Sequence, residues 1–126
     1  MKRKKLTASM IALVMSVSLP MTTYAANWYL EDGSVTVNAD NSGQTVTQGS
    51  NPAVSDEAPV ITQRESSVET GNTIAINASD NATANVTIKD INIKSSNDAI
   101  DVKGSSSANI TLEGDNKIFS ETGSAL

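Results

Sequence analysis

The chain has 126 residues, a formal net charge of −5, and neither cysteine nor histidine. Without cysteine no disulfide can form, and without histidine the usual general base at neutral pH is missing. The acidic balance disfavours binding to nucleic acid, because phosphate contacts need clustered lysine and arginine.

Residues 1–25 have the pattern of a secretory signal peptide. The basic residues 2–5 precede an apolar run at 10–19, and small residues then predict cleavage between Ala25 and Ala26, with Ala26/Asn27 as second choice. The apolar run is shorter than the roughly 20 residues that cross a bilayer, so we expect no membrane span. Removing the four positive charges of this leader changes the net charge from −5 to −9.

The remaining composition indicates the compartment. An exported chain that lacks cysteine and is rich in Ser, Thr and Asn is typical of a bacterial protein. We expect it to be secreted or held at the cell surface, in a Gram-positive bacterium.

Residues 26–71 show short and irregular patterns. Alternation at 35–38 and the segments 45–47 and 59–62 predict strands, and 40–43 predicts a turn. The stretches 49–57 and 64–71 have little periodicity. We expect this part to form irregular strands that cap the N-terminal side of the fold.

Residues 72–126 show clear period-two alternation, which is the signature of half-buried strands. No window after the leader has an apolar stripe at helical spacing, so essentially no helix is expected. The positions expected to face inward are Ile74, Ile76, Val86, Ile88, Ile91, Ile93, Ile100, Val102, Ile110, Leu112 and Ile118.

These strands also repeat. The phrase at 84–88 returns 24 residues later at 108–112, Ile93 is answered by Ile118 after 25, and Ile74 by Ile100 after 26. A spacing of about 25 residues is that of stacked coils, with three short strands in each. The sequence therefore predicts an all-β fold, a right-handed parallel β-helix (β-solenoid) of about three to four coils. Asn85 and Asn109 fall at equivalent positions and are expected to form an amide ladder.

The sequence stops at the start of a strand, and we expect the β-helix of residues 72–126 to be incomplete at its C-terminal end. An uncapped solenoid exposes backbone hydrogen-bonding groups and apolar core residues. Self-association through this open end is the expected consequence.

The wording of residues 84–126 resembles a known family. The segments 85–93, 98–104 and 108–118 are similar to the repeats of exported bacterial β-helix proteins called carbohydrate-binding domain-containing, which are pectate-lyase-like in form. The resemblance implies a module that binds acidic or plant-wall polysaccharide, with calcium held on the coil surface. Residues 26–71 match this pattern poorly.

Three functions follow as hypotheses. The first is a non-catalytic carbohydrate-binding module, in which calcium is held by Asp98, Asp101 and Asp115, since calcium prefers oxygen ligands. Trp28 and Tyr29 would stack on a sugar ring or, alternatively, plug the N-terminal end of the solenoid. The second is a structural or adhesive stalk with solvated turn residues. The third, a polysaccharide lyase, needs a basic residue in the repeats, and the only arginine after the leader is Arg64. We therefore expect no enzymatic activity.

Overall fold

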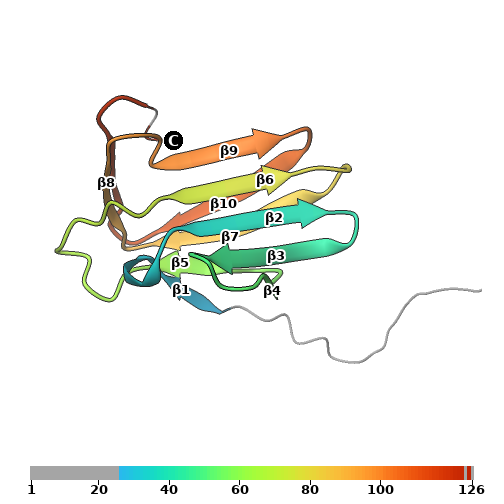
Figure 1. Cartoon of the computed structure of the whole chain (residues 1–126), viewed down its shortest axis with the longest axis horizontal. Helices are drawn as coiled ribbons and strands as arrows, with labels where there is room; N and C mark the ends of the chain where they lie inside the picture. Colours follow the sequence, from blue (N-terminus) through green and yellow to red (C-terminus); the bar gives the residue numbers. More distant parts are fainter. Residues whose placement is uncertain (1–25, 124, 126) are drawn as a thin grey trace, which may run out of the picture.

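The computed structural model describes residues 26–123 and 125, and Figure 1 gives its arrangement. The predicted leader, 1–25, and Leu126 lie outside the described residues. Strands dominate the fold, and the helical content of the described part is one 3-10 turn, η2. The elements are β1 (Asn27–Tyr29), η2 (Leu30–Asp32), β2 (Val35–Asp40), β3 (Gly43–Gln48), β4 (Val54–Ser55), β5 (Val60–Thr62), β6 (Ile74–Ala78), β7 (Thr83–Lys89), β8 (Asn92–Ser95), β9 (Ile100–Gly104), β10 (Ser107–Glu113) and β11 (Lys117–Ser120). The predicted all-β class is confirmed.

The strands form three sheets. Sheet A has the order β1-β5-β7-β10 and is parallel throughout. Sheet B has the order β4-β3-β2-β6-β9, in which β2, β6 and β9 are parallel while β3 and β4 run antiparallel to their neighbours. Sheet C consists of the parallel pair β8 and β11. In Figure 1 the strands of sheet B lie in front of β7 and β10.

The strand registers confirm the spacings predicted from the repeats. Ala84 pairs with Ala108, Ile93 with Ile118, and Ile74 with Ile100, which are separations of 24, 25 and 26 residues. The backbone N–H of Ile100 donates to the carbonyl of Ala125, 3.1 Å away, as the second 26-residue spacing predicts.

The apolar core lies between the sheets and is built mainly from β-branched residues, which fit a pleated surface. Seven of the eleven positions expected to face inward are buried: Ile74, Ile76, Val86, Ile88, Ile91, Ile93 and Ile100. Ile110 and Ile118 are half-buried and pack against this core.

Val102 and Leu112 correct that expectation, because they are 46% and 54% exposed. They pair with the buried Ile76 and Ile88. However, their strands, β9 and β10, end the strand orders of sheets B and A within the described chain. No further strand there covers the side chains that these two edge strands direct inward.

Residues 26–71, expected to be an irregular cap, contribute β1, β2 and β5 to the same sheets as the repeats. Between β2 and β6 the chain inserts β3 and β4, so Val35 pairs with Ile74 across 39 residues rather than about 25. The insertion hides the repeat in this part of the sequence.

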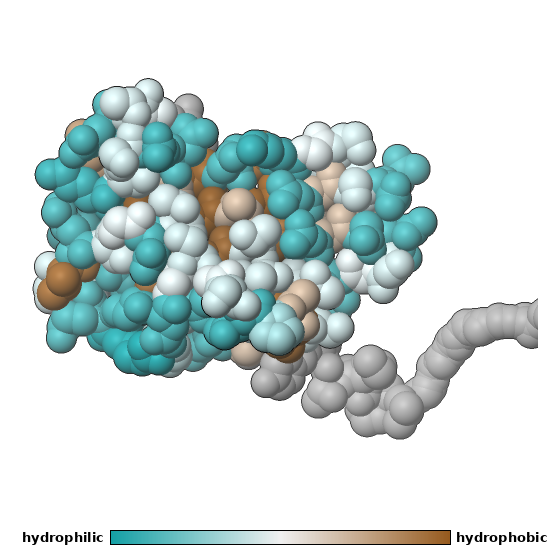
Figure 2. All heavy atoms as spheres, viewed as in Figure 1, coloured by the Kyte–Doolittle hydropathy of each residue, from teal (hydrophilic) through white to brown (hydrophobic). Residues whose placement is uncertain are grey.

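The surface seen in Figure 2 consists mostly of hydrophilic and neutral residues, with hydrophobic residues visible in narrow strips between them. Nothing in the described chain forms a helix of the length and apolarity that crossing a membrane takes.

Candidate functional site

The outer face of sheet B carries small polar side chains in two rows. Its strands alternate valine, isoleucine or alanine pointing into the core with threonine or asparagine pointing outward. One row is Thr47, Thr36, Ala75 and Asp101, and the other is Ser55, Thr45, Asn38, Asn77 and Lys103. Neighbours in each row stand on adjacent strands, about 4.8 Å apart. We call these two rows the sheet B rows.

The asparagines of the second row are held in a fixed orientation. Nδ2 of Asn77 donates to Oδ1 of Asn38 at 2.9 Å. The remaining groups, Nδ2 of Asn38 and Oδ1 of Asn77, have no partner among residues 26–123 and 125. This pair therefore offers one donor and one acceptor side by side to a ligand.

The sheet B rows end in an ion pair on β9. Nζ of Lys103 lies 3.0 Å from Oδ2 of Asp101. The hydrogen bond to Asp101 raises the pKa of Lys103, and the charge of the same carboxylate adds to the effect. Lys103 is the one cation in the two rows, and its charge is balanced by its neighbour.

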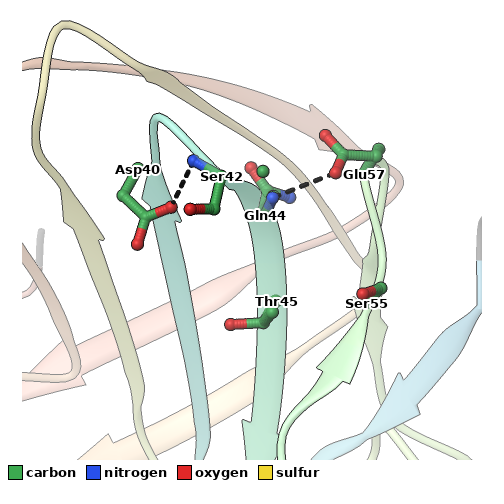
Figure 3. A pocket seen from close by; sticks show the side chains of 7 residues that line it. Asp40, Ser42, Gln44, Thr45, Ser55 and Glu57 are labelled. Carbon is green, nitrogen blue, oxygen red and sulfur yellow. Dashed lines mark hydrogen bonds between the residues drawn. The ribbon is translucent and has the colours of Figure 1, made fainter.

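At the opposite end the rows lead into a shallow pocket at the β2–β3 turn, which we call the hairpin pocket (Figure 3). Its volume is about 130 Å³. It is lined by Asp40, Ser42, Gly43, Gln44, Thr45, Ser55 and Glu57. Because Thr45 and Ser55 belong both to this lining and to the second row, the two surfaces are continuous.

Two carboxylates in the hairpin pocket are oriented by the backbone. Oδ1 of Asp40 accepts from the N–H of Ser42 at 2.8 Å, and Oε2 of Glu57 accepts from the N–H of Gln44 at 3.0 Å. Each carboxylate keeps its second oxygen available as an acceptor. Enclosed small-molecule sites usually measure about 300–1,000 Å³. The hairpin pocket is well below that range, so it suits one unit of a longer ligand.

The carboxylates predicted to hold calcium lie in separate places. Asp101 is on β9 and pairs with Lys103, Asp115 is in the turn between β10 and β11, and Asp98 precedes β9. No group of three or more acidic side chains in the described chain is arranged to hold a metal ion. Calcium binding stays a prediction.

Trp28 is half-buried and packs against the apolar core, and its Nε1 donates to Oδ2 of Asp56 at 2.8 Å. Its indole is thus held within the fold at β1.

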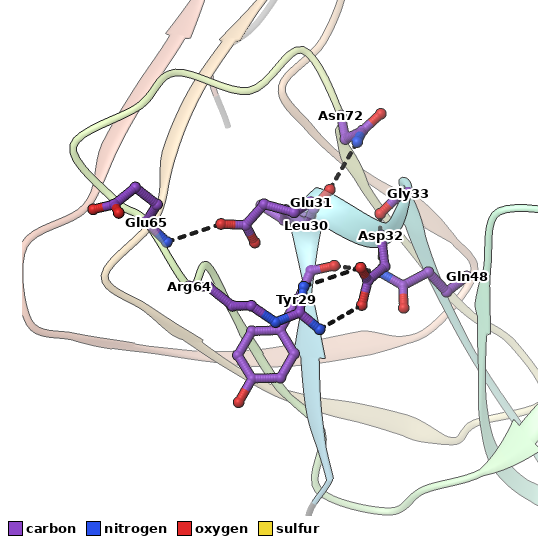
Figure 4. Close-up of polar contacts among 9 residues, drawn as sticks. All are labelled: Tyr29, Leu30, Glu31, Asp32, Gly33, Gln48, Arg64, Glu65 and Asn72. Carbon is purple, nitrogen blue, oxygen red and sulfur yellow. Dashed lines mark hydrogen bonds and ion pairs between the residues drawn. The ribbon is translucent and has the colours of Figure 1, made fainter.

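Tyr29 belongs to a charged cluster on the surface (Figure 4). The guanidinium of Arg64 lies 4.1 Å from the centre of the Tyr29 ring and donates to both carboxylate oxygens of Asp32, at 3.0 and 2.8 Å. These hydrogen bonds lower the pKa of Asp32 and raise that of Arg64. Burial acts to raise the pKa of Glu31, but hydrogen bonds from the backbone of residues 65, 64 and 31 outweigh it, so that pKa is lowered. Arg64 therefore covers one face of the aromatic ring.

Sequence reasoning did not single out the sheet B rows or the hairpin pocket. The signal for the rows was present in the outward positions of the alternating segments, such as Thr36 and Asn38 between inward valines. No such signal exists for the pocket, because its lining comes from two segments that are joined only by strand pairing.

No protein-family model, curated protein or solved structure matches this chain. The likeness of residues 84–126 to carbohydrate-binding β-helix proteins thus rests on the repeated phrases themselves.

Proposed function

We propose that this chain is an exported, non-catalytic module that binds polysaccharide along the outer face of sheet B, on a right-handed parallel β-helix. The strand order supports the architecture. β7, β8 and β9 lie in sheets A, C and B, and β10 and β11 return to sheets A and C in the same order. Ala125 then lies beside β9, the strand with which the next return to sheet B begins.

The observation that supports the function is the continuity of the sheet B rows with the hairpin pocket. Sugar hydroxyls both donate and accept hydrogen bonds, and threonine hydroxyls and asparagine amides do the same. A chain of sugars laid across the strands would meet such groups at each step, and the hairpin pocket would take one sugar unit. The rows present five strands' width, whereas the comparable Thr and Asn positions of sheet A lead to no such pocket.

The charges of this surface bear on the kind of polysaccharide. Asp40, Glu57 and Asp101 are acidic, and the single cation, Lys103, is already paired. A neutral polysaccharide meets no repulsion here. An acidic one needs a bridging cation, which is the calcium-assisted binding predicted from the turn carboxylates.

Binding is tested with the chain that begins at Ala26, by affinity electrophoresis or calorimetry on a neutral glucan and on polygalacturonate. Each glycan is used with calcium and then with a chelator. Retention of the glucan under both conditions indicates direct hydrogen bonding, and retention of polygalacturonate only with calcium indicates a cation bridge. Absence of retention on either glycan contradicts the proposal.

The location is tested by removing groups from the sheet B rows. Thr45→Val with Asn77→Ala removes two hydrogen-bonding partners worth about 1 kcal/mol each, so affinity should fall by roughly tenfold or more. The matched control is Thr111→Val with Asn109→Ala on the outer face of sheet A, which should leave affinity unchanged. A loss confined to the control variant would place binding on sheet A instead.

A structural or adhesive stalk is the second candidate, and the exposed inward positions Val102 and Leu112 favour it, because further stacking would cover them. In that case neither glycan is retained. For the third, a lyase, the relevant cation is Arg64, whose guanidinium is bonded to Asp32. The lyase predicts new unsaturated chain ends in the same polygalacturonate samples, and we expect none.

A further inference from the structure

A buried carboxylate lies beside the first residue of the predicted mature chain. Asp56, between β4 and β5, is 1% exposed. Burying a carboxylate in its charged form is costly unless hydrogen bonds or an opposite charge compensate it. The surroundings of Asp56 must therefore supply such groups.

Three donors reach the Asp56 carboxylate. Oδ2 accepts from the backbone nitrogen of Ala26 at 3.2 Å and from Nε1 of Trp28 at 2.8 Å, and Oδ1 accepts from the N–H of Ala58 at 3.1 Å. All three donors are neutral. The ion pairs found in the described chain, Arg64 with Asp32 and Lys103 with Asp101, do not involve Asp56.

Strand pairing holds Ala26 in this place. Its carbonyl accepts from the N–H of Val60 at 2.9 Å, at the point where β1 begins to pair with β5. The nitrogen of Ala26 is also the atom that the predicted cleavage between Ala25 and Ala26 would release. Hydrolysis of that peptide bond leaves a carboxylate on Ala25 and an amino group on Ala26, which takes up a proton at neutral pH.

We propose that removal of the leader creates an ion pair between the α-ammonium group of Ala26 and the buried carboxylate of Asp56. A neutral amide donor 3.2 Å from Oδ2 is replaced by a cation with three donors in the same place. Processing then stabilises the fold, and the chain reaches its full stability only after cleavage. The proposal rests on the predicted cleavage site and is independent of polysaccharide binding.

The test compares chains with defined N-termini. One begins at Ala26 with a free amine and the other carries two extra residues, Gly-Ser, before Ala26; both are also made with Asp56→Asn. The free amine should raise the thermal midpoint by about 5 °C or more over the extended chain, since about 1 kcal/mol shifts a domain of this size by that amount. With Asp56→Asn the difference should disappear. An equal difference in both backgrounds, or none in the native one, overturns the proposal.

A second measurement applies even if Asp56→Asn prevents folding. In the folded native chain, acetic anhydride should modify the α-amine more slowly than in the urea-unfolded chain, because the ion pair protects it. Mass spectrometry of the N-terminal peptide measures this, and equal rates contradict the ion pair. N-terminal sequencing of the exported protein gives the last check: a mature chain that starts at Asn27 would lack the required group.

Discussion

At the scale of single residues, the pair of Asp32 and Arg64 offers a direct electrostatic test. Hydrogen bonds from Arg64 lower the pKa of Asp32. A carboxyl whose folded pKa lies below its unfolded value stabilises the fold above that unfolded value. This contribution is lost as the pH falls through the folded pKa.

We therefore expect Arg64→Met to raise the pKa of Asp32 toward the ordinary value for aspartate. Carboxyl ¹³C chemical shifts followed through an acid titration measure it. The stability difference between native chain and variant should be present at neutral pH and shrink as Asp32 becomes protonated. Lys103→Met, which removes the cation of the other ion pair, is the control and should leave the titration of Asp32 unchanged. An unaltered Asp32 curve in Arg64→Met would show that the pair does not persist in solution.

Ile88 and Leu112 form a matched pair for measuring burial. They stand opposite each other on β7 and β10, yet Ile88 is fully buried and Leu112 is 54% exposed. Ile88→Ala should lower the free energy of unfolding by about 2–5 kcal/mol, through lost transfer energy and the cavity left behind. Leu112→Ala should cost less than about 1 kcal/mol. Urea unfolding measures both, and equal losses would mean that Leu112 is covered in solution.

At the scale of elements, a glutamine side chain takes the place of a strand. Gln44, buried on β3, meets Asn85 of β7 as a neighbouring backbone would: Oε1 accepts from the Asn85 N–H at 2.8 Å and Nε2 donates to the Asn85 carbonyl at 2.9 Å. Nε2 also donates to the carbonyl of Asp56 at 3.0 Å. One amide thus joins sheet B to sheet A and to the segment before β5.

Replacing this amide by an apolar group of similar size should be costly. Gln44→Leu leaves the N–H and carbonyl of Asn85 without their partner, and each unpaired buried group costs about 1–3 kcal/mol. We expect a loss of more than about 2 kcal/mol in urea unfolding and faster hydrogen exchange at the Asn85 amide. Gln48→Leu, which affects the opposite end of β3, is the control for exchange at Asn85. Unchanged exchange in Gln44→Leu would argue against the bridge.

The elements that the sequence predicted well are those whose partners repeat their own pattern. β6 to β11 stack on equivalent strands about 25 residues away, so equal spacing of isoleucine and valine was enough to predict their register. The Asn85–Asn109 ladder followed from the same spacing and is present at 3.1 Å.

The β3–β4 insertion could not be predicted in the same way. Its strands have no repeat to align with, and their antiparallel pairing depends on contacts between distant segments. The hairpin pocket arises from that insertion, so it was hidden for the same reason. The buried glutamines are a further case, because only tertiary context distinguishes a glutamine that replaces a strand from one in water.

At the scale of the whole molecule, the described fold has one end where strands remain open. β9 and β10 each have a free edge, and the side chains of Val102 and Leu112 are exposed beside it. Unpaired strand edges next to apolar side chains favour pairing with another chain. Val68, although 58% exposed, lies in the loop between β5 and β6, where no strand edge accompanies it.

We therefore expect the 126-residue chain, after removal of the leader, to self-associate through the β9 and β10 edges. Val102→Thr with Leu112→Thr removes apolar surface from the open end while keeping residues suited to strands, and should shift the protein toward monomer. Sedimentation velocity over a range of concentrations measures the shift. Val68→Thr removes a comparable exposed side chain away from the edges and should leave the association unchanged. If both variants reduce association equally, general surface hydrophobicity is responsible, and a native chain that is monomeric at every concentration contradicts association through this end.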